Sequence, residues 1–235
     1  MKKISLSICS IIVGFILVLV FSLNINLKKD KVYADSSAKA MCLIETGSSR
    51  KLYSKNETIK LPMASTTKIV TALTVLDNCS DLDEEFKIDN RAVGIPGTSI
   101  YLKQDETLTV RELLYGMMLP SGNDAATALA YHIANDIPRF CELMNKTASK
   151  CGAYNSNFEN PHGLDSPGHF TTAYDLALIT AQALRNETFK DIVTTKSTKI
   201  RGSSEGSYRY LKNKNRLLNS LDGCIGVKTG YISLS

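Results

Sequence analysis

The sequence predicts an α+β protein in which one antiparallel sheet takes strands from both ends of the chain and a helical subdomain lies between them. Strand-like segments occur near residues 38–54 and again from residue 196 onward, whereas the middle of the chain repeats apolar residues at helical spacing. The 235 residues, 43% of them hydrophobic and 22% charged, suffice for one substantial core and exclude a disordered, collagen-like or polytopic membrane protein. We therefore expect one large domain, over residues 35–235.

Residues 1–34 are typical of an export signal. Two lysines precede an uncharged, largely apolar run over residues 4–27, which is the order of charge and hydrophobicity found in signal peptides. Cleavage is expected before Asp35, with a weaker second site after Ala40. Because about 20 apolar residues can also span a bilayer, an uncleaved N-terminal anchor that holds the protein at a membrane stays open as the alternative.

Most of the net positive charge lies in this leader. Residues 1–34 hold four of the five net positive charges, so residues 35–235 carry a net charge of only +1, and no nucleic-acid partner is predicted. Apart from Cys9 in the leader, the chain has five cysteines, an odd number without a C-x-x-C pair. We expect at least one free thiol, cysteines that act as small buried hydrophobes, and no metal site.

The first elements of the domain are a hairpin and a buried helix. Residues 38–45 and 50–54 predict two antiparallel strands joined by a turn at 46–49. The period then changes, and apolar residues at helical spacing predict a largely buried helix that begins near Ser65.

Four more helices are predicted in the middle of the chain, each with a sequence signal at its start. A capping box at residues 109–112 opens a helix over 110–119, and an alanine-rich helix follows over about 124–134. Pro138 fits the first turn of a helix that ends at Gly152, and residues 172–175 open another to about residue 185.

The remaining segments are predicted to be a loop and a return to strands. Residues 160–171 contain glycine and proline and are expected to form a loop. Extended segments are expected from Lys196 onward, with a turn at 202–206 and a last strand that carries residues 226–230.

Ser65 and Lys68 form an S-x-x-K pattern at the start of the predicted buried helix. On a helix, a spacing of three places both side chains on one face within hydrogen-bonding distance. A serine hydroxyl needs an adjacent base to act as a nucleophile, and a lysine kept neutral by burial or by nearby cations can be that base. The backbone N–H of Ser65 can also stabilise an oxyanion. The pattern is short, and an N-cap serine beside a surface lysine is the alternative.

Two further patterns follow in chain order, Ser121-Gly-Asn123 in the loop between two predicted helices and Lys228-Thr-Gly230 on the last predicted strand. Ser121 can relay a proton between the nucleophile and a leaving amine, and Asn123 can hydrogen-bond a substrate amide. Lys228 and Thr229 offer a cation and a hydroxyl for a substrate carboxylate. The three patterns together predict acyl transfer through a serine.

On these motifs the chain resembles the low-molecular-mass penicillin-binding proteins, the serine-type D-alanyl-D-alanine carboxypeptidases. The resemblance covers nearly all of residues 36–231, including the segments 64–68, 119–126, 160–165 and 222–231. It implies a β-lactamase/transpeptidase-like fold, an exported enzyme at the cell wall or membrane, and no metal or organic cofactor. It also implies that the substrate is a peptidoglycan stem peptide ending in D-Ala-D-Ala and that β-lactams are covalent inhibitors.

The same resemblance assigns roles to individual residues. Ser65 would be acylated, Lys68 would be the base and Ser121 the proton relay, and the oxyanion hole would use the N–H groups of Ser65 and Tyr231. Substrate-binding roles are implied for Asn123, Lys228, Thr229 and Gly230.

Other enzyme classes fit the sequence less well. A class A β-lactamase needs a glutamate in an E-x-x-L-N loop, and the loop with Glu159 and Asp165 does not have that pattern. Residues 202–206 match the G-x-S-x-G of an α/β-hydrolase but are flanked by polar segments typical of a hairpin turn. His162 and Asp165 could belong to a Ser-His-Asp site, but we favour the interpretation that His162 is a loop histidine at the margin of the site.

A rival of a different kind is a non-catalytic remnant or binding module. Relatives continue past the K-T-G motif with two more strands of the central sheet and a terminal helix, and these are expected to be missing here. Tyr231 is followed by Ile232, where the family commonly has threonine. Because catalysis depends on positioning within a fraction of an ångström, an incomplete scaffold would make the chain inactive.

Overall fold

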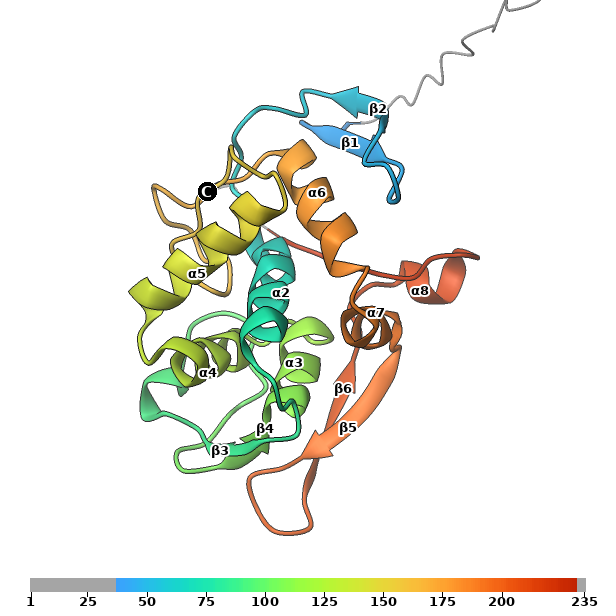
Figure 1. Ribbon diagram of the computed structural model, residues 1–235. Helices are drawn as coiled ribbons and strands as arrows, with labels where there is room; N and C mark the ends of the chain where they lie inside the picture. The colour runs from blue at the N-terminus through green and yellow to red at the C-terminus, as the bar shows by residue number, and fades with distance from the viewer. Residues whose placement is uncertain (1–36, 232–235) are drawn as a thin grey trace, which may run out of the picture. The chain divides into compact units, whose positions relative to one another are not determined.

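The computed structural model describes residues 37–231. The chain divides after Ser37, and the unit that begins at Ala38 holds all the helices and strands described below. The expected leader over residues 1–34 and its cleavage site before Asp35 lie outside the described residues. The α+β class is confirmed, because helices occupy the centre of this unit and antiparallel strand pairs lie around them (Figure 1).

The predicted N-terminal hairpin is confirmed. Strand β1 (Met41–Ile44) pairs antiparallel with β2 (Lys51–Lys55). The turn between them is closed by the carboxylate of Glu45, which accepts hydrogen bonds from the backbone N–H groups of Gly47 and Ser48 at 2.7 and 2.6 Å. Side-chain oxygens that bond nearby N–H groups are a common way to stabilise a turn.

The central helix is α2 (Lys68–Asn78), which follows the short 3-10 helix η1 (Ala64–Thr67). The first eight residues of α2 are all buried, because α3, α4, α5 and α6 pack around it (Figure 1). A helix that is buried on every side is expected to be apolar all round, so a lysine as its first residue is an exception. This exception marks the candidate site.

The other predicted helices form with the expected starts. α3 (Val110–Met118) begins with the capping box of Thr109 and Glu112, and α4 (Asn123–Ala134) follows the Ser121 loop. α5 (Ile137–Lys150) carries its proline in the first turn, and α6 (Ala173–Ala183) is capped by the Thr172 side chain. Residues 160–171 form the predicted loop, without a helix or strand.

Among the described residues, two α-helices, two strands and the 3-10 turn η2 (Asn90–Ala92) were not predicted. α7 (Glu187–Thr194) is capped by the side chain of Asn186, and α8 (Leu217–Ser220) is a single turn. β3 (Glu85–Lys87) and β4 (Thr107–Thr109) pair antiparallel over three residues each.

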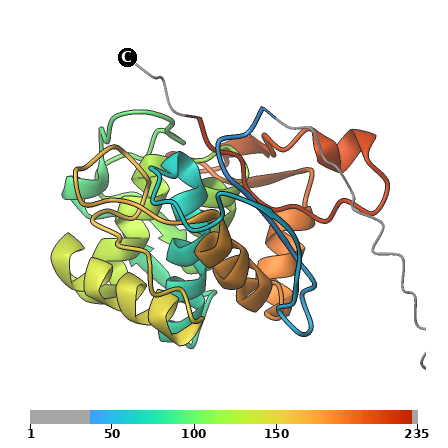
Figure 2. The same ribbon diagram turned by 90° about the horizontal axis from the view of Figure 1, so that it is seen from above.

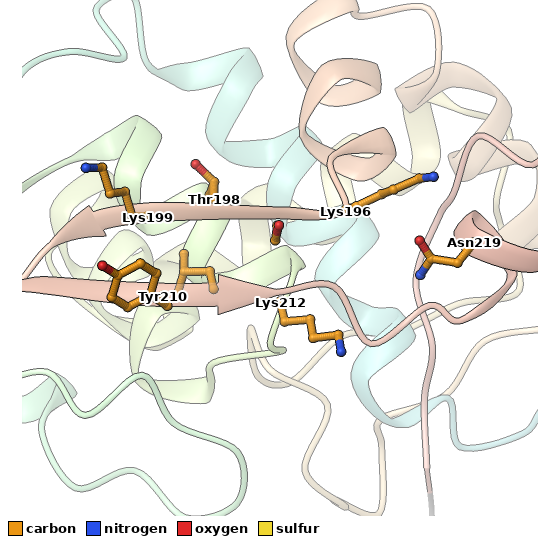
Figure 3. Close-up of a pocket in the computed structure, with 8 residues that line it drawn as sticks. Lys196, Thr198, Lys199, Tyr210, Lys212 and Asn219 are labelled. Atoms are coloured by element: carbon orange, nitrogen blue, oxygen red, sulfur yellow. The ribbon is translucent and has the colours of Figure 1, made fainter.

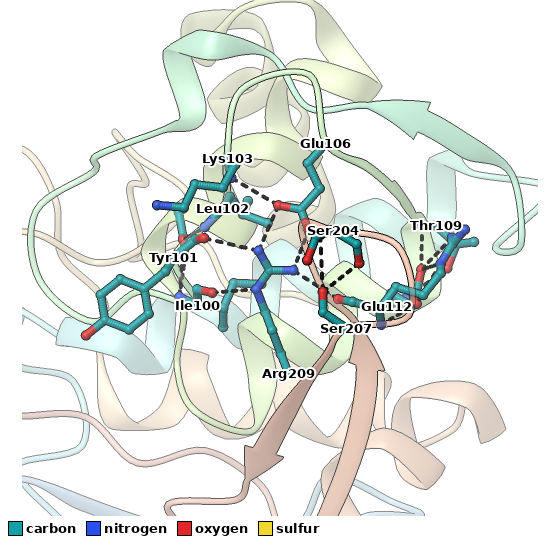
Figure 4. Close-up of polar contacts among 12 residues, drawn as sticks. Ile100, Tyr101, Leu102, Lys103, Glu106, Thr109, Glu112, Ser204, Ser207 and Arg209 are labelled. Atoms are coloured by element: carbon teal, nitrogen blue, oxygen red, sulfur yellow. Dashed lines mark hydrogen bonds and ion pairs between the residues drawn. The ribbon is translucent and has the colours of Figure 1, made fainter.

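The hairpin of β5 (Ser197–Arg201) and β6 (Tyr208–Lys212) is fixed to the helical region by an arginine on each strand. Arg209 forms a buried ion pair with Glu106 and donates to the carbonyl of Ile100 at 2.8 Å (Figure 4). Arg201 forms an ion pair with Glu112 at 2.7 Å, so the glutamate of the capping box also holds the hairpin. Arg201 thus attaches the hairpin to α3, and Arg209 attaches it to the segment that precedes β4.

The prediction of one sheet with strands from both chain ends is wrong for the described residues. Their strands form three separate two-stranded sheets, and residues 226–230 are not a strand. Among residues 37–231, the backbone of residues 225–231 makes no backbone hydrogen bond to a neighbouring segment. A groove of about 440 Å³ lies between β1 and residues Val227 and Lys228, and α6 also lines it. A strand needs a neighbouring segment that hydrogen-bonds its backbone, and β1 and residues 227–228 form no backbone hydrogen bonds with each other across this groove.

Candidate active site

The S-x-x-K residues lie where η1 leads into α2. Ser65 is in η1, and Lys68 is the first residue of α2. The Oγ of Ser65 lies 3.1 Å from the Nζ of Lys68, which confirms the expected hydrogen-bonding distance. The pair does not lie on a regular α-helix as expected, because the tighter 3-10 turn contains the serine. A 3-10 turn has about three residues per turn, so positions i and i+3 are eclipsed.

Lys68 is fully buried and surrounded by oxygen atoms. Its Nζ lies 2.7 Å from the Oδ1 of Asn123 and 2.6 Å from the backbone carbonyl oxygen of His162. Burial lowers the pKa of Lys68 well below its usual value, and the positive charges of Lys228 and Lys214 lower it further. Desolvation and neighbouring cations both disfavour the ammonium form.

These contacts match a neutral amine. A neutral lysine has two N–H donors and one lone pair. The two oxygens of Asn123 and His162 can only accept, so they use both donors, and the lone pair is left for the hydroxyl proton of Ser65. The same three oxygens could also accept from the three donors of an ammonium, so the lowered pKa of Lys68 is the observation that favours the neutral form.

The S-x-N residues precede and begin α4. Asn123 spans two elements, because its Oδ1 accepts from Lys68 while its Nδ2 donates to the carbonyl of Pro96 at 2.6 Å. Ser121 has a positive φ of 75°, and its buried Oγ has no hydrogen-bond partner among the described residues. A buried hydroxyl without a partner in a sparsely populated backbone conformation is costly, and such features gather at functional sites.

The K-T-G residues pass beside the serine turn, although they do not form the predicted strand. A Cβ placed on Gly230 would lie 3.1 Å from the carbonyl oxygen of Met63 and 3.4 Å from the Cβ of Ala64. Lys228 is half-buried, and Thr229, Gly230 and Tyr231 are exposed. Burial lowers the pKa of Lys228 to about 8, and the charge of Lys214 adds to this effect.

Two backbone N–H groups remain available near the serine. Among the described residues, neither the N–H of Ser65 nor that of Tyr231 donates a backbone hydrogen bond. These are the two groups that the resemblance implies for an oxyanion hole. An N–H group that is already used by the fold could not stabilise a developing negative charge.

The structure adds contacts that the sequence analysis missed. The carbonyls of His162 and Pro96 fix Lys68 and Asn123, and main-chain atoms carry no side-chain signature in a sequence. Lys214, which lowers the pKa of both Lys68 and Lys228, lies in the short segment between β6 and α8. The only available signal for it was the basic segment 212–216.

The residues of the rival interpretations lie elsewhere or are already paired. Glu159 accepts hydrogen bonds from Ser166 and from the backbone N–H of Gly168 within its own loop. His162 makes no hydrogen bond to Asp165 among the described residues. Residues 202–206 form the turn between β5 and β6, as expected.

A larger groove of about 850 Å³ lies on the β5–β6 hairpin, away from the motif residues (Figure 3). It is lined by Lys196, Ser197, Thr198, Lys199, Tyr210, Leu211, Lys212 and Asn219. In the part of the chain that the structure describes, no group of three or more His, Cys, Asp or Glu side chains could hold a metal ion. The five described cysteines are free, but only Cys141 is buried, so the expectation of small buried hydrophobes holds for that one.

Comparison with known proteins places the chain in a family. The family model of the D-alanyl-D-alanine carboxypeptidases, peptidase family S11, matches residues 27–235. D-alanyl-D-alanine carboxypeptidase DacF of Bacillus subtilis is 35% identical over 198 residues, which cover 83% of this chain and 51% of DacF. A D-alanyl-D-alanine carboxypeptidase of Streptomyces sp. strain K15 is 36% identical over 202 residues, which cover 80% of this chain and 69% of that protein.

A solved structure agrees with these relatives. The crystal structure of the Streptomyces K15 DD-transpeptidase matches with a TM-score of 0.78 and 33% identity, over 86% of this chain and 83% of that one. The chain spans about half the length of DacF and about two thirds of the K15 carboxypeptidase. Among residues 37–231, no helix is both long and apolar enough to cross a membrane. On the family match over residues 27–235 and these relatives, the chain belongs to the D-alanyl-D-alanine carboxypeptidase family, the S11 peptidases.

Proposed function

We propose that the chain is a serine D,D-carboxypeptidase that removes the terminal D-alanine from peptidoglycan stem peptides. The observation that carries this proposal is the environment of Lys68, whose buried amine contacts Ser65 Oγ and two oxygens that can only accept. That arrangement supplies a base for the serine at neutral pH. Relatives of the same family carry the name D-alanyl-D-alanine carboxypeptidase.

The acylation step uses the atoms around Ser65. The Nζ lone pair of Lys68 takes the hydroxyl proton while Ser65 Oγ bonds to the carbonyl carbon of the penultimate D-alanine. The N–H groups of Ser65 and Tyr231 stabilise the oxyanion. The C–N bond then breaks, and Ser121 Oγ, which has no partner of its own, gives its proton to the leaving D-alanine amine and takes up the proton that Lys68 had removed from Ser65, so that Lys68 is neutral again. Water hydrolyses the acyl-enzyme in the second step, with the proton flow reversed.

The substrate carboxylate would bind at the K-T-G residues. With a pKa of about 8, Lys228 is mostly charged at pH 7, so it can pair with a carboxylate, and its charge helps to lower the pKa of neighbouring Lys68. Thr229 adds a hydroxyl, and the exposed Gly230 leaves room for the substrate backbone. Asn123 would hydrogen-bond the substrate amide with its side chain. Because Lys228 loses its proton above pH 8, the KM for the peptide is expected to rise there.

The proposed function also implies which inhibitors the protein binds and where it acts. β-Lactams would acylate Ser65 and leave slowly, because they present the same acyl carbon to the same nucleophile. The protein would act outside the cytoplasm on the cell wall, delivered by the segment over residues 1–34 and held at the membrane if that segment is retained. Neither a metal nor an organic cofactor takes part in the proposed steps.

A second candidate is transfer of the acyl group to an amine. It is favoured by the likeness to the Streptomyces K15 DD-transpeptidase over 86% of this chain. Both reactions share the acyl-enzyme on Ser65 and differ only in whether water or an amine attacks it. The acceptor therefore decides between them.

The test is release of D-alanine from a diacetyl-L-Lys-D-Ala-D-Ala peptide by the purified full chain, with and without added glycyl peptide. We expect D-alanine and the shortened peptide from the wild type, and neither from Ser65→Ala or Lys68→Ala. A product that contains the glycyl peptide would instead support transpeptidation. Folded protein that releases no D-alanine and forms no adduct would favour the non-catalytic alternative.

A further inference from the structure

A buried histidine that the proposed chemistry does not use contacts the serine turn. His169 lies in the loop over residues 160–171 and is only 4% exposed. Its Nε2 is 2.9 Å from the Oγ1 of Thr67, and its Nδ1 is 2.9 Å from the backbone nitrogen of Glu159. Thr67 is the last residue of η1, the serine turn, and directly precedes Lys68.

These two contacts determine where the proton of the histidine lies. The backbone N–H of Glu159 can only donate, so Nδ1 of His169 must accept and carry no proton. In a neutral ring the proton is then on Nε2, which donates to Thr67 Oγ1. The hydroxyl of Thr67 in turn donates to the carbonyl oxygen of Ala64 at 2.8 Å.

The direction of this hydrogen-bond chain matters because it ends on the residue before Ser65. Ala64 has a φ of 48°, in the left-handed region that an L-residue adopts only at a cost. The carbonyl oxygen of Ala64 accepts a hydrogen bond from the Thr67 hydroxyl. Gly163 packs against the same oxygen so closely that a Cβ added to this glycine would lie 1.9 Å from it. The surroundings therefore hold Ala64 in a conformation that it would not adopt alone.

We propose that His169 is a positioning residue for the nucleophile, which acts through Thr67 and requires the tautomer with its proton on Nε2. The hydrogen bond from Nε2 orients the Thr67 hydroxyl toward Ala64, and the fixed carbonyl of Ala64 sets the direction in which Ser65 leaves the turn. This inference rests on the proposed function, in which Ser65 is acylated.

The surroundings of His169 keep it neutral. Burial lowers its pKa to about 4, although the charges of Glu159 and Asp165 act in the opposite direction. His162, the other nearby titratable ring, has a pKa lowered to about 3 by burial and by Lys68 and His169. At the pH of the proposed reaction both rings are uncharged, so His169 keeps one donor and one acceptor.

Two substitutions separate the functions of the two ring nitrogens. In His169→Gln the side-chain amide can reach the Nε2 position and donate to Thr67, whereas in His169→Asn the amide oxygen takes the Nδ1 position and the donor to Thr67 is lost. For the full chain we expect the rate of acylation by benzylpenicillin to fall about tenfold in His169→Asn, the effect of one lost buried hydrogen bond. In His169→Gln we expect it to stay within about threefold of the wild type.

The Thr67 variants test whether the effect passes through that hydroxyl. Thr67→Ser keeps the hydroxyl and should acylate like the wild type, whereas Thr67→Val should lose about as much as His169→Asn. The double variant Thr67→Val with His169→Asn should be no slower than Thr67→Val alone, because both changes break one chain. Additive losses would show that the two residues act independently and would overturn the proposal.

Hydrogen exchange tests the inference without relying on activity. The N–H of Thr66 bonds the Met63 carbonyl, and that of Lys68 bonds carbonyls within the turn, so both report on the turn. We expect their exchange to speed up about tenfold in His169→Asn and not in His169→Gln, while the Asn213 amide, bonded to Lys196 near the β5–β6 hairpin, stays unchanged in both.

Each outcome decides the question. Equal effects of Gln and Asn, a larger effect of Gln, or no effect of either would overturn the proposal, because each shows that the donor on Nε2 does not hold the turn. If the wild type forms no adduct with benzylpenicillin, the proposed function fails, while the exchange at Thr66 and Lys68 still decides whether His169 positions the turn.

Discussion

Replacing Asn123 by aspartate places a negative charge beside the proposed base with almost no change of shape. The Oδ1 of Asn123 lies 2.7 Å from Lys68 Nζ, so the new charge would interact directly with that amine. At an effective dielectric constant of about 20, two unit charges at this distance attract by about 6 kcal/mol. Desolvation of the aspartate offsets part of this energy. A net 1.4 kcal/mol would already raise the pKa of Lys68 by one unit.

The assay is the rate of acylation by benzylpenicillin between pH 5 and pH 10. The wild-type rate rises as Lys68 loses its proton, and because the pKa of Lys68 is lowered, that rise occurs well below the usual range of lysine. In Asn123→Asp the rise should move by at least about one pH unit toward alkaline pH. The rate at pH 7 should fall at least about tenfold, and it should recover at high pH.

Asn123→Ala is the matched control. Like aspartate, alanine loses the donor to the Pro96 carbonyl; it also loses the hydrogen bond to Lys68, which aspartate keeps, and it adds no charge. We expect a lower rate at all pH values and no alkaline displacement of the profile. If Asn123→Asp keeps the wild-type midpoint, the protonation of Lys68 does not control acylation, and Lys68 is not the base.

Two other predictions concern stability and the packing of the serine turn. Glu106→Gln leaves the buried charge of Arg209 unpaired and should lower the free energy of unfolding in urea by about 3 kcal/mol or more; a loss below about 1 kcal/mol would show that this ion pair does not hold the hairpin. Gly163→Ala should destabilise the protein and slow acylation, because its φ is 92° and the new Cβ would meet the Ala64 carbonyl. Gly206→Ala, with a φ of 73° and nothing within 4 Å, should cost only about 1 kcal/mol and leave acylation unchanged; equal losses for the two would refute the packing argument.

Local signals in the sequence predicted most of the helices and the spacing of the S-x-x-K pair. The capping box at Thr109 and Glu112 and the caps at the starts of α5 and α6 are interactions within four residues, so a sequence displays them directly. α7 could have been found by the same reasoning, because Asn186 caps it through Phe189 N–H and its apolar residues are buried. β3 and β4, with three residues each, are too short to show an alternating pattern.

The errors arose where long-range contacts decide the structure. Residues 226–230 were predicted to be a strand, but strand formation depends on backbone partners that the segment itself does not specify. The carbonyls of His162 and Pro96 are held in place by loops far away in the chain, so the ligands of Lys68 and Asn123 could not be predicted from side-chain motifs. The charge of Lys214 acts through space and is likewise not part of a motif.

On the proposed function, this chain assembles an acylation site around Ser65. The most direct measurement is the intact mass of the purified chain after incubation with benzylpenicillin, followed by peptide mapping of any adduct. We expect one bound penicillin on Ser65, and none in Ser65→Ala, whose circular dichroism spectrum should match that of the wild type. Folded wild-type protein without an adduct, or an adduct that persists in Ser65→Ala, would show that Ser65 is not the nucleophile of such a site.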